Sequence, residues 1–460
     1  MKLKLVVASM SLLGLITSPE AFATTHHNHK HHAVKQEAEV APVAYKGMVP
    51  VEVCPLSDPY ISMMDAMGQN LGRAKPTQDC NKLLALAGGA NFDAKWGNRS
   101  MGYQTENTQR VSLNDVYLNL FGNVNDWTKA FASISYNDAS GISTTFNPFN
   151  PNSNFASKAG QYSNVYPVNT LTLEQGYVQI SNFEQSPLFL KLGKFYQDFG
   201  RYTIHPITRS LTQSLSESLH TAAQAGFITR MGFHGDIAAF DTPLNQRRSY
   251  PTVLQGVTSN VQGHKTTDYT AAIGFDQMND QLGWGVNLGY MYNMVGVNDI
   301  TQVISEYQSL NVFATGGTYR NRVAAGTIDA YITSGPFSLI GDYVTAMQNF
   351  SNNDLNSKGL AANFYGTNNG AKPWAANLQA GYGFTGWNRN QNVYLGYQAS
   401  GNAVVVFLPK NRWVAGYNID MWKNTNLGLE LDHDTDYGTS QGGTGNTSNL
   451  INFRAGVKFG

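Results

Sequence analysis

A strict alternation of apolar and polar side chains runs through most of this chain. The alternation is unbroken in residues 90–96. In each of the stretches 284–292, 374–384 and 413–421, apolar residues occupy every second position. Successive side chains of a β-strand point to opposite faces, so each set lies on one face of a sheet. The pattern predicts an all-β protein.

The apolar sets mostly begin and end with Trp, Tyr or Phe, and their middles are small or aliphatic. Aromatic side chains gather at the two water–lipid boundaries of transmembrane sheets. Charged residues make up only 13% of the chain, whereas soluble domains average about 25%. A sheet with one face in lipid explains this shortage.

The connections between the alternating stretches also alternate, short then long. Outer-membrane barrels have this order, with short turns in the periplasm and long loops outside. Short turns are expected near 122–128, 182–187, 233–235, 278–283, 333–336, 385–391 and 422–425. Long polar loops are expected near 138–170, 197–221, 241–267, 294–322, 347–372, 400–411 and 434–449.

The number of strands follows from this order. Fifteen candidates begin near Arg110, and the first runs downward, so an upward strand at 88–97 must precede it. We therefore predict a transmembrane antiparallel up-and-down β-barrel of about sixteen strands, with fourteen to eighteen as the range. Both ends of the barrel then lie on the periplasmic side.

The N-terminus has the parts of a secretory signal peptide: Lys2 and Lys4, an apolar stretch over 5–16, and Ala21-Phe22-Ala23 before the cleavage point. We assign residues 1–23 to this signal, 24–84 to a short periplasmic segment and 85–460 to the barrel. The predicted location is the outer membrane of a Gram-negative bacterium, with outer-membrane lipids as partners.

The predicted periplasmic segment holds the two cysteines, Cys54 and Cys80, which we expect to form a disulfide in an oxidising compartment. A metal or redox pair is the alternative. The segment opens on a histidine-rich tail that could bind a transition metal or be a solvated linker. Its histidines are His26, His27, His29, His31 and His32.

No enzyme motif of the GxSxG, HExxH or P-loop type is present, and no cofactor is implied. We therefore predict a protein that is not an enzyme, with a barrel hydrolase as the alternative. The formal net charge is zero, which gives no electrostatic case for nucleic acid.

Charged residues within the predicted strands should face the lumen or the rims, because a Lys or Arg at the bilayer midplane costs about 2–4 kcal/mol. Positive and negative residues occur in similar numbers in these strands, so the sequence does not predict selectivity for anions or for cations. A water-filled pore and a closed, plugged interior both remain open, since sixteen strands leave room for a channel. We interpret Asp432, Asp434 and Asp436 as the acidic mouth of an outer loop. The alternative, a calcium-binding loop, needs a bidentate Glu at position 443, where this chain has Gly443.

The stretch 191–233 reads as a strand, a long loop and a strand. Its loop carries Ile204, Ile207, Leu211 and Leu215, which is too apolar for a loop in water, so we expect it to fold inward as a constriction or to cover the rim. We expect five residues to contribute to a constriction or ligand contact: Lys191, Lys194, Arg201, Arg209 and Glu217.

This stretch carries a resemblance to a known family. Gly193-Lys194, Tyr196 and Phe199-Gly200, followed by Leu211-Thr212, Glu217, Thr221-Ala222 and Gly226-Phe227, resemble the siderophore porins of Legionella and related intracellular bacteria. The stretch from Trp413 to Phe459 resembles uncharacterised outer-membrane proteins of Legionella and Coxiella. The resemblance implies a sixteen-stranded barrel and suggests uptake of an iron–siderophore.

The last strand alternates from Ile451 to Phe459 and resembles the signal that barrel-assembly machinery recognises in its clients, which makes that machinery a second expected partner. The functional hypothesis is a porin-like protein for passage of small solutes. A closed structural barrel, or a surface adhesin with host-facing loops, is the alternative.

Overall fold

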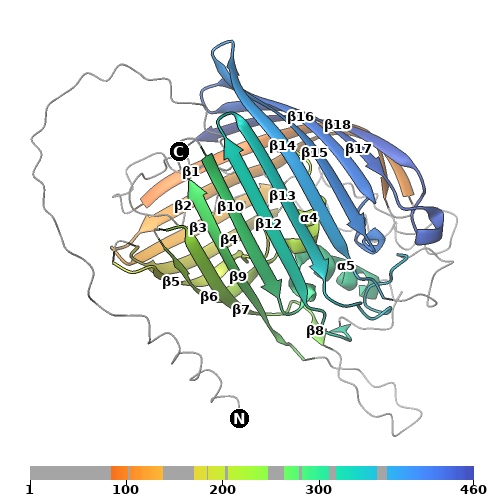
Figure 1. Ribbon diagram of the computed structural model, residues 1–460, viewed down its shortest axis with the longest axis horizontal. Helices are drawn as coiled ribbons and strands as arrows, with labels where there is room; N and C mark the ends of the chain where they lie inside the picture. The colour runs from red at the N-terminus through yellow and green to blue at the C-terminus, as the bar shows by residue number, and fades with distance from the viewer. Residues whose placement is uncertain are drawn as a thin grey trace, which may run out of the picture. The chain divides into compact units, whose positions relative to one another are not determined.

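The computed structural model describes residues 84–101, 104–137, 170–183, 185–201, 206–229, 231–246, 264–278, 282–309, 318–359 and 370–459. Within these residues, sixteen antiparallel strands close into one barrel, and each pairs with the barrel strands before and after it in the chain (Figure 1). The ring is completed by pairing of the last strand with the first. The predicted up-and-down barrel is confirmed.

The barrel strands are β1 (Leu84–Met101), β2 (Gln104–Asn123), β3 (Thr128–Asn137), β4 (Thr170–Ser181), β5 (Leu188–Tyr196), β6 (Leu219–Ile228), β7 (Phe233–Asp241), β9 (Thr267–Met278), β10 (Leu282–Met291), β12 (Ala325–Ser334), β13 (Phe337–Ala346), β14 (Trp374–Gly386), β15 (Arg389–Gly401), β16 (Asn411–Trp422), β17 (Thr425–Thr435) and β18 (Thr447–Phe459).

The long connections carry the remaining elements. Two short strands, β8 (Asn245–Gln246) and β11 (Thr318–Tyr319), form a separate parallel pair. The helices are α4 (Leu211–Ser216) and α5 (Asn298–Ser309), with single 3₁₀ turns η3 (Met294–Gly296), η5 (Val404–Val406) and η6 (Thr439–Gln441). None of the helices in the described residues is long and apolar enough to cross a bilayer.

From β2 onward the order of short and long connections agrees with the prediction, with one shift in position. It departs from strict alternation at the start, because only residues 102–103 separate β1 from β2. The turn expected at 233–235 lies at 229–232, and β7 already begins at Phe233. Gly232 explains this position, because its φ is +95° and a Cβ there would lie 1.9 Å from the carbonyl oxygen of Asp276. Only glycine fits such a close approach without strain.

The outer face of the barrel is apolar. Leu188, Leu190 and Leu192 of β5 are exposed, while the alternate residues of the strand are buried. Exposed aromatic residues lie near both ends of the strands, as expected for two girdles: Tyr269, Tyr290, Tyr397 and Trp413 toward the long loops, and Phe233, Phe337, Tyr382 and Trp422 toward the short turns.

A closed sheet is what a lipid environment requires, because hydrocarbon offers no partner to a free strand edge. The apolar outer face, the girdles and the closure therefore identify an outer-membrane type of barrel. The predicted signal peptide and the predicted segment 24–84, apart from Leu84, lie outside the described residues.

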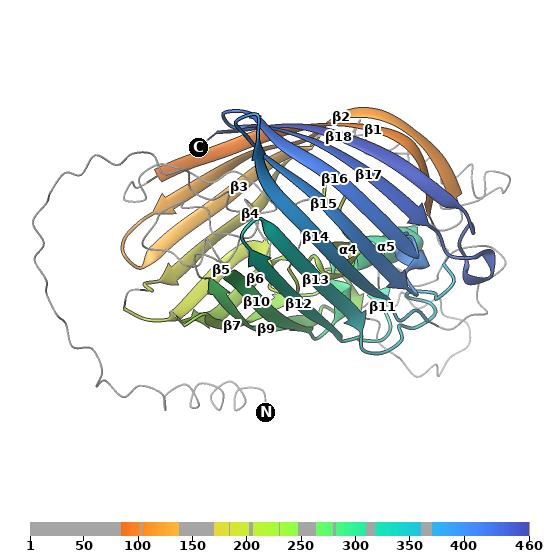
Figure 2. The same cartoon turned by 45° about the horizontal axis from the view of Figure 1, so that its top comes forward.

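The long-loop end of the lumen contains an apolar core. It includes Leu211 and Leu215 of α4, Ile300 and Ile304 of α5, and Val405 of η5, all almost completely buried. Helix α4 packs against β13, β14 and β15 and against α5, and both helices lie within the ring of strands (Figure 2). The interior is thus partly filled from one end.

Candidate constriction of the barrel lumen

The connection from β5 to β6 folds into the barrel, as the sequence predicted. We call residues 197–201 and 206–218 the inward segment. Its helix α4 is buried along all six residues. Ser210 starts the helix, and its Oγ accepts a hydrogen bond from the backbone N–H of Gln213 at 3.1 Å.

The inward segment is bound to a distant part of the wall. Glu430 of β17, six strands away from β5 around the ring, accepts hydrogen bonds from the backbone N–H groups of Ile207 and Thr208, each at 2.7 Å. The Thr208 hydroxyl donates to Asp432 at 2.7 Å and accepts from Asn452 of β18 at 2.9 Å. These bonds carry the chain across the lumen.

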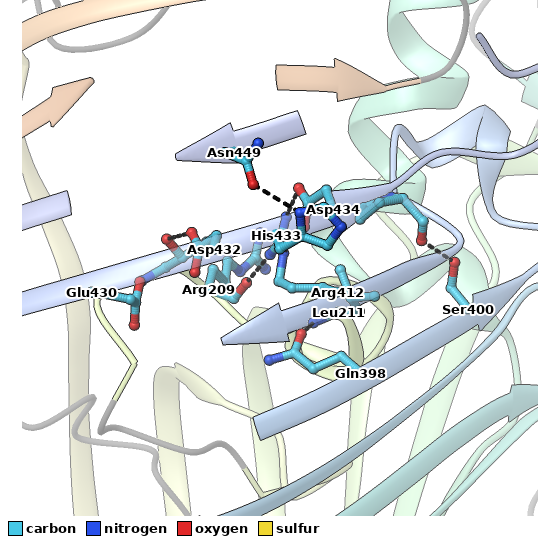
Figure 3. Close-up of polar contacts among 12 residues, drawn as sticks. Arg209, Leu211, Gln398, Ser400, Arg412, Glu430, Asp432, His433, Asp434 and Asn449 are labelled. Carbon is cyan, nitrogen blue, oxygen red and sulfur yellow. Dashed lines mark hydrogen bonds and ion pairs between the residues drawn. The ribbon is translucent and has the colours of Figure 1, made fainter. Parts of the chain in front are cut away.

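A second set of bonds holds α4. The Thr212 hydroxyl donates to the carboxylate of Asp342 on β13, and the backbone N–H of Leu211 donates to Gln398 of β15 at 3.0 Å. Figure 3 shows this junction, with Gln398 beside Leu211. Because the donors lie on the segment and the acceptors on the wall, the helix has a fixed position in the barrel.

Arg412 of β16 links the segment to the acidic face of β17. Its guanidinium binds both carboxylate oxygens of Asp434, at 2.6 and 2.9 Å, and also donates to the carbonyl oxygen of Arg209 at 3.2 Å (Figure 3). Bidentate arginine–carboxylate pairs are among the most specific polar contacts in proteins.

Arg201 anchors the start of the segment to the wall next to it. Its guanidinium binds both oxygens of Asp276 on β9, at 2.8 and 2.7 Å, and lies 3.1 Å from Nε2 of His234 on β7. Burial opposes the charge of Arg201, but the Asp276 carboxylate outweighs burial and raises the pKa of the guanidinium. Arg201 therefore stays charged and paired.

Arg209 and Glu217 meet, as expected of residues in one site. Their side chains lie 3.2 Å apart, and Arg209 also binds both oxygens of Asp299 on α5, at 2.8 and 2.9 Å. These three charged groups tie the two ends of α4 to α5.

The two predicted lysines lie on opposite faces of β5. Lys191 points inward but is fully buried, with its ammonium 3.9 Å from the ring centre of Phe195. Lys194 shares the outer face with Leu190 and Leu192, and its Nζ donates to the carbonyl oxygen of Leu173 at 3.0 Å. The structure does not bring Lys194 to the inward segment.

The acceptors on the far wall were missed by the sequence reasoning. Asp432 and Asp434 lie within β17, and both side chains are buried. Their interpretation as the mouth of an outer loop is therefore wrong. The sequence contained a signal for this arrangement. Glu430, Asp432 and Asp434 occupy every second position, which places them on one face of a strand.

The remaining predicted sites are not part of this constriction. His26, His27, His29, His31 and His32, and the Cys54–Cys80 pair, lie outside the described residues. Where the structure describes the chain, no group of three or more His, Cys, Asp or Glu side chains is placed to hold a metal ion.

Comparison with known sequences finds relatives in two bacterial genera. A UPF0422 protein of Coxiella burnetii is 26% identical over 275 residues, which cover 58% of this chain and 51% of the relative. UPF0422 proteins of Legionella pneumophila are 26% identical over 304 residues (strain Lens; 62% and 53%) and 24% identical over 398 residues (strain Philadelphia 1; 82% and 66%). The chain spans about half the length of the first two relatives. No family model matches the chain.

Solved outer-membrane proteins are similar at low identity. The channel DcaP of Acinetobacter baumannii has a TM-score of 0.47 at 12% identity, covering 82% of this chain and 97% of that one. OprB of Pseudomonas putida gives 0.49 at 12% (82% and 94%), and an anion-selective porin of Comamonas acidovorans gives 0.48 at 10% (82% and 99%).

Proposed function

We propose that this protein is an outer-membrane channel for small polar solutes whose passage is set by the inward segment. The observation that carries the proposal is the contact of Glu430 with the backbone of Ile207 and Thr208, which holds the segment across the lumen. A loop that is bound to both sides of a barrel reduces the width of the lumen. The width then does not depend on how the side chains of the loop move.

The inner face below the segment supports an aqueous path. Toward the short turns it carries amide and hydroxyl side chains beside the aromatic side chains of Phe131, Tyr177 and Phe189. The amides and hydroxyls are those of Asn119, Gln179, Ser181, Thr333 and Ser338. Apolar side chains packed from wall to wall would fill a closed interior, whereas a water-filled lumen is lined by polar ones. Sixteen strands leave enough width for such a lumen.

An iron–siderophore is the more specific cargo that we propose. Its support is the resemblance of residues 193–227 to siderophore porins, a stretch that includes most of the inward segment. As partners we propose outer-membrane lipids on the apolar outer face, and the barrel-assembly machinery at the last strand, where Ile451, Val457 and Phe459 face outward.

A closed structural barrel or adhesin is the competing function. The apolar core of α4, α5 and η5 favours it, because this core occupies part of the lumen at the long-loop end. The two functions differ in whether ions pass through the isolated protein.

Planar-bilayer recording tests the proposal. Purified, folded protein should give stepwise current increases, and the same preparation after heat denaturation should give none. Adding a ferric siderophore to one side should interrupt the current if the chelate enters the lumen. A folded preparation that stays silent would contradict the channel and favour the closed barrel, whereas steady current without interruption contradicts only the proposed cargo.

A further inference from the structure

The buried charges of the barrel are mainly acidic. Among the described residues, twelve Asp or Glu side chains are at most 9% exposed, against three Lys or Arg side chains, Lys191, Arg201 and Arg412. The similar numbers of positive and negative residues in the predicted strands do not hold for the buried interior. Few of the Lys and Arg side chains are buried there. The half-buried Arg209 and Arg454 each already bind a carboxylate.

Two of these acids face each other with no cation between them. Asp329 of β12 and Asp342 of β13 are directly opposite in register, and both are buried. Like charges in this position destabilise a sheet. The hydrogen-bond donors that reach them are neutral. Asp329 accepts from Asn287 at 3.3 Å and from the backbone N–H of Arg201. Asp342 accepts from Asn377 at 3.0 Å and from the Thr212 hydroxyl.

The guanidinium nearby does not neutralise the pair. Arg201 attracts Asp329, but two of its nitrogens are already bonded to Asp276, at 2.8 and 2.7 Å. No ion pair of the described residues joins Asp329 or Asp342 to a Lys or Arg within 4.0 Å. The two carboxyl groups therefore face each other beside the inward segment without an ion-pair partner among the described residues.

Unpaired oxygen atoms give a second, independent observation. The side-chain oxygens Oε1 of Gln179 and Gln224 and Oδ1 of Asn287 and Asn377 are buried without a hydrogen-bond partner, and so is Oδ1 of Asp236. Buried polar atoms in folded proteins normally have partners. Among the described residues, such unpaired acceptors outnumber unpaired N–H donors, so the interior offers fewer hydrogen-bond donors than acceptors.

We propose that the lumen passes cations in preference to anions, with Asp329 and Asp342 as specificity-determining residues. The inference rests on the proposed channel function and names the charge class of its solutes. A hydrated cation supplies what the interior lacks, since it offsets the carboxylates and its water molecules donate to the unpaired oxygens. An anion meets carboxylates and acceptor oxygens, and both repel it.

The reversal potential under a potassium chloride gradient tests this inference. The wild-type channel should show a potassium-to-chloride permeability ratio above one. The isosteric double variant Asp329→Asn/Asp342→Asn should lower this ratio at least about twofold. Asp126→Asn is the matched control, because Asp126 is exposed in the turn between β2 and β3, and it should leave the ratio unchanged.

A measurement on the wild type alone covers the case in which the double variant does not fold. Raising the ionic strength screens fixed charges, so the ratio should fall toward one as both salt concentrations rise together. A channel of normal conductance with a ratio of one or below overturns the inference and leaves the proposed function standing. A silent bilayer contradicts both.

Discussion

The hydroxyl of Thr208 donates a hydrogen bond to Oδ2 of Asp432 at 2.7 Å, although 224 positions separate the two residues in the chain. Neither residue belongs to a recognisable motif. Their contact joins the inward segment to the far wall, so it converts a long apolar loop into a fixed crossing of the lumen.

Weakening the neighbouring Glu430 contact should loosen this crossing. Glu430→Gln keeps the shape of the side chain but removes the charge and one acceptor oxygen. A hydrogen bond to a charged group contributes roughly 1.5–3 kcal/mol, so the segment should be held less tightly. We expect larger current fluctuations and a higher mean single-channel conductance. His433→Gln is the control, because His433 lies on the exposed face of the same strand. Equal traces from both variants would show that the Glu430 contact does not hold the segment.

Arg201 and Asp276 should behave as a coupled pair. Asp276→Asn leaves the buried guanidinium without its charge partner, and losses of this kind cost about 3–5 kcal/mol. The double variant Arg201→Met/Asp276→Asn should recover part of that loss. Urea unfolding of the four proteins in detergent micelles measures the coupling. Single-variant effects that simply add would contradict the pairing.

Tyr437 should make the β17–β18 loop sensitive to alkaline pH. Its hydroxyl lies 2.6 Å from Ser400, whose Oγ donates to the carbonyl oxygen of Pro409 at 2.7 Å. Burial raises the pKa of Tyr437 from 10.0 to about 12. The folded state therefore holds this proton more tightly than the unfolded state, and the resulting stability is present below pH 10 and is lost between about pH 10 and 12.

Comparison of the wild type with Tyr437→Phe isolates this effect from the other tyrosines. The free energy of unfolding of the wild type should fall more steeply than that of the variant as the pH rises through this window. Parallel curves would mean that the Tyr437 hydroxyl is ionised as easily in the folded loop as in the unfolded chain.

Lys194 should have no influence on permeation. Its ammonium is bound to the carbonyl oxygen of Leu173 on the outer face of β5. Lys194→Glu should therefore leave the single-channel conductance and the ion selectivity at their wild-type values. A changed conductance in planar bilayers would place the Lys194 side chain in the lumen, against the strand register.

The strands were predictable because one face of each lies in lipid. That constraint imposes the two-residue alternation and the aromatic ends, and together these gave the number of strands and nearly all connections. The same alternation could have separated Lys191 from Lys194, since an odd spacing places two residues on opposite faces of one strand. We expected both in the constriction because charged residues within predicted strands should face the lumen or the rims.

The partners of the inward segment were not predictable in the same way. A loop has no period, and nothing local indicates which wall it meets. The contacts of Thr208 with Asp432 and of Leu211 with Gln398 depend on closure of the ring and on the register of strands more than a hundred residues later. The apolar residues of the loop indicated only that it folds inward.

Cross-linking between Thr208→Cys and Asn452→Cys tests the crossing of the lumen most directly. Both native cysteines, Cys54 and Cys80, are replaced by serine so that no other thiol is present. In the folded protein a short bifunctional thiol reagent should join the two positions and change the mobility of the denatured chain on a gel. The matched pair Thr208→Cys/Ile451→Cys should not react, because Ile451 faces outward. If the first pair stays unlinked, or both pairs link equally, the inward segment does not lie against β18 and the proposed constriction is wrong.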